Sequence, residues 1–93
     1  MNLKISYSKE ANKFLKKNQN IIAEEEVDKL IISAVRKIFK TEETNINLKK
    51  LKGKHRGSFR VKKGDMRIIF SLKKDKILEV LVNDIDFRGN IYK

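Results

Sequence analysis

The chain has 93 residues, the length of one small domain, and we expect a single domain over residues 1–93. It contains no cysteine, which excludes disulfides and thiolate chemistry. Its N-terminal segment has no continuous apolar run, so we expect neither a secretory signal nor a membrane span, and a cytoplasmic protein. The formal net charge of +11 favours nucleic acid or an acidic protein as partner, although a lysine-rich coding bias that serves only solubility also gives a basic chain.

The positive charge is concentrated in the second half of the chain. Residues 45–93 hold fourteen Lys and Arg against five Asp and Glu, whereas residues 8–44 hold eight against seven. A general bias toward lysine would spread the charge more evenly, so this distribution favours a basic surface with a function.

The first half predicts a strand and two helices. Alternating apolar residues indicate a strand over Asn2–Tyr7. Ser8 is a good N-cap for a first helix that carries Ala11, Phe14 and Leu15, and Asn18–Asn20 interrupts the helical pattern. Asn20 can cap a second helix, so about three residues join the two and we expect them to pack as an antiparallel pair.

The second helix has the clearest periodicity in the chain. Its apolar stripe follows i, i+3, i+4, i+7 spacing and comprises Val27, Leu30, Ile31, Ala34, Val35 and Ile38. Acidic residues in its first turns and basic residues in its last turn match the helix dipole. Ile32 and Phe39 lie off this stripe and are predicted to make a second contact, either to the sheet or to a partner.

The segment Ser58–Leu72 predicts a β-hairpin, and the segments before it predict loops. Thr41–Asn47 is polar, and residues 48–57 combine lysines with Gly53 and Gly57, which permit turns. In the hairpin, apolar residues alternate with polar ones on both sides of Lys63-Gly64-Asp65. This alternation assigns Arg60, Lys62 and Arg67 to one face of the sheet and the apolar residues to the other.

The last predicted strand is the apolar run Ile77–Val82, and Asn83–Asp86 is predicted to leave it. The element order is therefore β-α-α-β-β-β. We expect an α+β fold in which two helices cover one face of a mostly antiparallel, four-stranded sheet. The opposite face stays open and carries Arg60, Lys62 and Arg67.

The residues available for chemistry favour RNA cleavage without a metal. One histidine and no cysteine do not make the usual zinc site, and no glycine-rich phosphate loop is present, so we expect no metal and no cofactor. RNA can be cleaved by attack of its own 2′-hydroxyl when the protein supplies a base, an acid and positive charge. Arginine suits the last role because its planar fork matches phosphate oxygens.

Three features together resemble the RelE/ParE superfamily of toxins from type II toxin–antitoxin modules. They are the β-α-α-β-β-β order, the segment LKGKHRGSFRVKKGDMRIIF and the ending FRGNIYK. The resemblance covers nearly the whole chain. It implies a RelE-like fold with a shallow basic concavity, a cognate antitoxin with a disordered acidic segment, and binding to the ribosome, where RelE-like members cleave mRNA.

The resemblance also implies the site residues. Arg67 is similar to the arginine that stabilises the scissile phosphate, Arg60 and Lys62 to the basic pair on the preceding strand, and Arg88 and Tyr92 to the closing motif. The predicted catalytic residues are therefore Arg67, Lys62, Arg60, Arg88 and Tyr92. The predicted RNA-binding residues are Lys49, Lys50, Lys52, Lys54, His55, Arg56 and Lys63.

Two positions depart from the family pattern. Phe87 stands where many members have a histidine, and Asp86 stands about where RelE-type enzymes have an arginine. Three functions follow as alternatives: an mRNA endoribonuclease that depends on the ribosome, a ParE-like inhibitor of DNA gyrase, and a toxin-fold protein that binds nucleic acid or a partner without catalysis.

Overall fold

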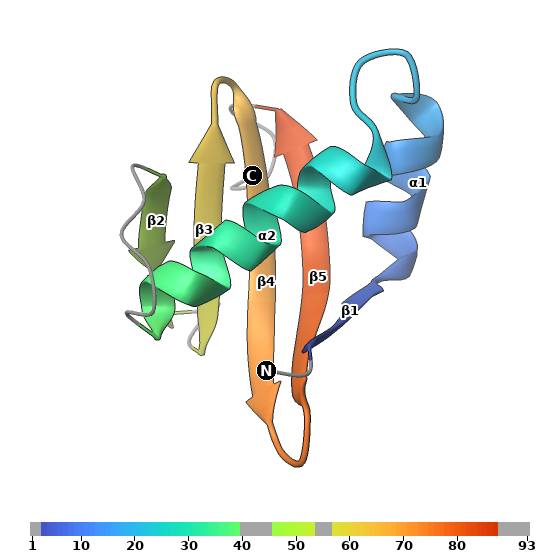
Figure 1. Cartoon of the computed structure of the whole chain (residues 1–93). Helices are drawn as coiled ribbons and strands as arrows, with labels where there is room; N and C mark the ends of the chain where they lie inside the picture. Colours follow the sequence, from blue (N-terminus) through green and yellow to red (C-terminus); the bar gives the residue numbers. More distant parts are fainter. Residues whose placement is uncertain (1–2, 40–45, 54–56, 88–93) are drawn as a thin grey trace.

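Two helices lie over one face of a five-stranded sheet in the computed structural model, which describes residues 3–39, 46–53 and 57–87 (Figure 1). The elements in chain order are β1 (Leu3–Tyr7), α1 (Lys9–Lys17), α2 (Glu24–Ile38), β2 (Asn47–Lys50), β3 (Ser58–Lys63), β4 (Met66–Lys74) and β5 (Leu78–Phe87). The predicted α+β class is confirmed. Within the described ranges, neither helix has the length and apolar character needed to cross a bilayer.

The sheet has the strand order β1-β5-β4-β3-β2 and is mixed. β1 pairs with β5 in parallel, and the other neighbours are antiparallel. The prediction of four strands missed β2, which pairs with β3 from Asn47 to Lys50. Its sequence, NLKK, contains one apolar residue, so it has no alternation to detect, and pairing with β3 supplies what the local sequence lacks.

The predicted hairpin is confirmed. β3 and β4 pair from Ser58↔Ser71 to Lys63↔Met66. Gly64 in the turn has a φ of 60°, a conformation that costs glycine little because it has no Cβ.

The prediction that Asn83–Asp86 leaves the strand is wrong, because β5 continues to Phe87. The β4–β5 register shifts between Ile69 and Phe70, and Asn83 is the extra residue of a β-bulge. Leu78, Val80 and Val82 face the helices before the bulge, and Ile85 and Phe87 after it. The bulge changes the phase of the alternation, so a search for a single period of two loses the strand at Asn83.

α1 begins where it was predicted. The Ser8 Oγ accepts a hydrogen bond from the Ala11 backbone N–H at 3.1 Å, as an N-cap should. The same hydroxyl donates to the Asn83 carbonyl at 2.7 Å, and the Ser8 N–H donates to the Val82 carbonyl at 2.9 Å. One residue therefore starts the helix and ties it to the bulged region of β5.

α2 begins three residues later than the predicted cap at Asn20 implies. Its N-cap is Ala23, which makes no side-chain capping bond, and acidic side chains in the first turn complement the dipole instead. The connection to α1 is therefore residues 18–23, twice the predicted length. α1 contacts β5 and β1, and α2 crosses the sheet at an incline (Figure 1).

The core lies between the helices and the sheet. The predicted stripe of α2 is confirmed: Val27, Ile31, Ala34 and Val35 are buried, and Leu30 and Ile38 pack against the cluster. Phe39 also packs against this core, and its ring lies 5.6 Å from the Lys74 Nζ. Phe39 was predicted to contact either the sheet or a partner, and the contact with the sheet side is the one observed. Ile32 is half-buried.

A hydrogen bond from the Tyr7 hydroxyl to the Asp28 carboxylate joins β1 to α2 across the layers. Burial of the phenol, together with this bond, raises the pKa of Tyr7 well above its ordinary value of 10.0. The neutral form of Tyr7 is therefore the form that stabilises the fold.

We expect Tyr7→Phe to lower the free energy of unfolding by about 1–2 kcal/mol at pH 7, because the Asp28 acceptor loses its donor. Above about pH 10, Tyr7 ionises in the unfolded chain and resists ionisation in the folded one, so wild-type stability falls with pH through this group. Tyr7→Phe lacks that loss, and the two proteins should converge in urea unfolding as pH rises from 8 to 11. Parallel curves over this range would contradict the linkage.

Candidate nucleic-acid interface

The register of β3 and β4 places the predicted cations on the face away from the helices. Val61 pairs with Ile68, and both are fully buried in the helix-side core. Side chains alternate along a strand, and directly paired residues share a face. Arg60, Lys62 and Arg67 therefore point to the opposite side, with Lys62 directly paired with Arg67.

Lys49 of β2 joins this group. It pairs with Arg60 and thus lies on the same face at the exposed edge of the sheet. We refer to Lys49, Arg60, Lys62 and Arg67 as the cation face. The four residues come from three adjacent strands, which hold them more rigidly than a loop can.

The two arginines of the cation face are half-buried and partly fixed. Arg60 Nη2 donates to the Asn47 Oδ1 at 2.8 Å, and the Nε atoms of Arg60 and Arg67 are both shielded from solvent. Ile69 lies between them on this face, and it is only 1% exposed although it lies outside the helix-side core. Side chains held in this way lose less conformational freedom when they bind a phosphate.

Two carboxylates share the face with these cations. Asp86 pairs with Arg67, and Asp84 pairs with Ile69. The Asp86 Oδ1 accepts a hydrogen bond from the Phe87 N–H at 2.7 Å, which fixes its orientation. Both carboxylates belong to the segment predicted to leave the strand, so their place on this face corrects that prediction. A sequence signal does mark their position: the apolar residues of this strand fall at even numbers up to Val82 and at odd numbers from Ile85.

Phe87 points the other way. It pairs with Met66 on the helix side, and its ring centroid lies 5.3 Å from that of Phe14 in α1. The position at which many RelE-like members have a histidine is therefore used for packing in this chain.

The remaining predicted RNA-binding residues do not all join the cation face. Lys50 pairs with Phe59 and Lys63 pairs with Met66, which assigns both lysines to the helix side. Lys52 is exposed in the segment after β2. The other predicted residues lie outside the described part of the chain: Lys54, His55, Arg56, Arg88 and Tyr92.

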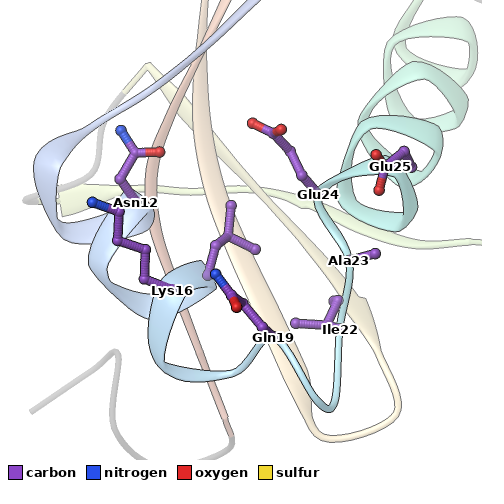
Figure 2. Close-up of a pocket in the computed structure, with 8 residues that line it drawn as sticks. Asn12, Lys16, Gln19, Ile22, Ala23, Glu24 and Glu25 are labelled. Atoms are coloured by element: carbon purple, nitrogen blue, oxygen red, sulfur yellow. The ribbon is translucent and has the colours of Figure 1, made fainter.

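Two hollows lie beside the helices, and one of them reaches around the edge of the sheet to Lys62 of the cation face. One, of about 360 Å³, separates the end of α1 from the start of α2, with Asn12 and Lys16 on one wall and Glu24 on the other (Figure 2). The second, of about 640 Å³, lies between α2 and the edge of the sheet, and both Lys62 and Lys63 contribute to its lining. Across residues 3–39, 46–53 and 57–87, no three His, Cys, Asp or Glu residues are grouped so as to hold a metal ion.

No protein-family model and no curated protein matches the sequence. Solved structures do match it. A copper-bound mutant toxin from Helicobacter pylori is 20% identical, with a TM-score of 0.71 over 97% of this chain and 99% of that one. A mutant YafQ from E. coli is 16% identical, with a TM-score of 0.66 over 96% and 97% of the two chains.

A third similar structure is the E. coli DinJ–YafQ toxin–antitoxin complex, in which the matching chain is 18% identical with a TM-score of 0.64 over the full length of both chains. Matches at this level of identity establish the architecture, and they agree with the resemblance found in the sequence. The chain has the RelE-like fold of toxins from toxin–antitoxin systems.

Proposed function

We propose that this chain is the toxin of a toxin–antitoxin pair and that it inhibits translation by cleaving mRNA on the ribosome. The observation that carries the proposal is the cation face, where two arginines and two lysines from adjacent strands share one side of the sheet away from the helices. The fold, which is that of known toxins, supports the same conclusion.

The proposed reaction is attack of an RNA 2′-oxygen on the adjacent phosphorus. The P–O5′ bond breaks, leaving a 2′,3′-cyclic phosphate and a 5′-hydroxyl. Arg67 and Arg60 stabilise the charge that develops on the phosphate oxygens, because a guanidinium is always charged and its donors match those oxygens. Lys62, directly paired with Arg67, binds the same phosphate or takes the 2′-proton. Tyr92 remains the predicted proton donor to the leaving oxygen.

The proposed partner is an antitoxin with an acidic segment. In the DinJ–YafQ structure, a chain of this fold is bound to an antitoxin. The hollow beside α2 has three lysines and one glutamate in its lining, namely Lys29, Lys62, Lys63 and Glu26, so it suits a segment of net negative charge. A segment bound there would lie against Lys62 and restrict access to the cation face.

The non-catalytic alternative has specific observations in its favour. Asp86 lies opposite Arg67, where the RelE-type pattern has an arginine, and Phe87 packs toward the helices. Both features reduce the positive charge and the acid–base groups near the phosphate site. A protein with this face can bind RNA and block translation without cutting it.

RNA binding through the cation face should depend on salt in a residue-specific way. We expect Lys49→Ala and Lys62→Ala each to lower the slope of log K against log salt for single-stranded RNA by about 0.7, since each removes one phosphate contact. The matched control is Lys13→Ala on α1, which removes an exposed charge from the other layer and should leave the slope unchanged. An equal effect of all three variants would mean that net charge, and not this face, binds RNA.

Cleavage should require Arg67. In a purified translation system read by primer extension, we expect wild-type protein to produce cuts in the ribosomal A site and Arg67→Ala to reduce them about 10²–10³-fold, the usual cost of removing one donor to a developing oxyanion. Lys13→Ala should cut like wild type. Arrested ribosomes on intact mRNA would support the non-catalytic alternative, and inhibition of DNA supercoiling with intact mRNA would support a gyrase inhibitor.

The partner proposal predicts rescue of growth. We expect induction of this chain alone to stop growth, and co-expression of an acidic protein encoded beside it to restore growth. Lys29→Glu reverses a charge in the hollow beside α2 and should weaken that rescue, with the toxic activity retained. Full rescue of the Lys29→Glu toxin would place the antitoxin elsewhere.

A further inference from the structure

The sheet face that carries the cations also has a neutral hollow farther along its strands. The hollow has a volume of about 340 Å³ and is lined by Ser6, Ser71, Leu72, Lys73, Glu79, Val80 and Leu81. Ser71 pairs with Leu81 and with Ser58, and Leu81 pairs with Ser6 of β1, so these residues share one face. Ser71 follows Ile69 by two residues on β4, which assigns the hollow to the same side as the cation face.

The lining of this hollow combines an apolar surface with hydroxyl groups. Leu81 is 42% exposed, one of only two large hydrophobic residues in the described part of the chain that are so exposed. The Ser71 Oγ accepts a hydrogen bond from the Asn83 side-chain amide at 3.3 Å, which leaves its own hydrogen able to donate. An apolar patch beside hydroxyl donors fits a flat ring with polar edges. Lys73 and Glu79, which are directly paired in the sheet, give the lining no net charge, so the hollow offers little attraction for a phosphate.

The spacing between the hollow and the cation face fits neighbouring parts of one RNA strand. Two residues along a strand advance about 7 Å, so the row Ser71–Leu81 lies about that far from the row Arg60–Ile69–Asp84. Arg60 and Leu81 also lie two strands apart, about 10 Å across the sheet, so a strand with a phosphate at Arg60 must extend across β4 to place a base over Leu81. RNA recognition commonly uses bases that are splayed out of their stack and held by packing and edge hydrogen bonds.

We propose that this hollow is a nucleobase-binding subsite for the RNA strand whose phosphates bind the cation face. Leu81 packs against the face of the base, and Ser71 donates to its edge. The subsite makes binding depend on the base, whereas the cation face contacts the backbone alone. It rests on the proposed function only in taking RNA as the ligand, and it requires no cleavage.

A single-stranded RNA and copies of it with one abasic position, moved along the strand, test this proposal by equilibrium binding. We expect Leu81→Ala to weaken binding of the intact RNA about three- to tenfold, and to have no effect on the RNA whose missing base is the one in the hollow. The salt slope should stay as in wild type, because no phosphate contact is lost. Ser71→Ala should show the same dependence on that one base.

The matched control is Ile21→Ala. Ile21 is the other exposed large hydrophobic residue, 66% exposed in the connection between the helices. The Ile21→Ala variant should bind every RNA, intact or abasic, as wild type does. Equal weakening of intact and abasic RNAs by Leu81→Ala would overturn the proposal, as would unchanged RNA binding with weaker binding of a protein partner. Failure of ribosome-dependent cleavage with base-dependent binding intact would contradict the proposed function and leave the subsite standing.

Discussion

The β-bulge at Asn83 determines which side chains accompany the cations. Without it, β5 would keep the phase set by Val80 and Val82, and Asp84 and Asp86 would face the helices. Burying two carboxylates against Val61 and Ile68 would cost several kcal/mol for each uncompensated charge. With the bulge, Ile85 and Phe87 complete the core, and the two carboxylates lie on the same side as Arg60 and Arg67.

The bulge is held from outside the sheet as well as within it. Ser8 donates to the Asn83 carbonyl, and the Asn83 amide donates to Ser71. Asn83 therefore links the start of α1 to the open face. As a result, the same contacts that fix the helix on the sheet also determine which side chains of β5 join the cations. Bulges next to functional sites commonly serve to redirect side chains in this way.

The open face could be predicted from sequence for β3 and β4 but not for β5. Alternation around the Lys63–Asp65 turn was sufficient to assign Arg60 and Arg67 to one side, because both strands keep a single phase. The contribution of β5 depends on a register shift that a search for one unbroken period of two does not detect, although Val82 and Ile85 mark the change of phase. β2 was missed for a related reason, since a four-residue edge strand with one apolar residue owes its conformation to its partner. The start of α2 at Glu24 was missed because its N-cap, Ala23, makes no side-chain capping bond, whereas Asn20 is the better capping residue in the sequence.

On the open face, the sign of the charge changes from positive at the β2 side of the sheet to negative at β5. Positive side chains lie on β2, β3 and the start of β4, and carboxylates occupy β5 at the same level. A polyanion is attracted toward the β2–β3 side and repelled from Asp84 and Asp86, so its backbone is confined to one track instead of spreading over the sheet. Bases attached to a backbone on that track extend toward β5, where Leu81, the only exposed apolar side chain of the described strands, lies three residues before Asp84. Asp84 and Asp86 weaken the attraction of the cation face for anions in general. For the same reason, they favour a single orientation of a bound RNA strand.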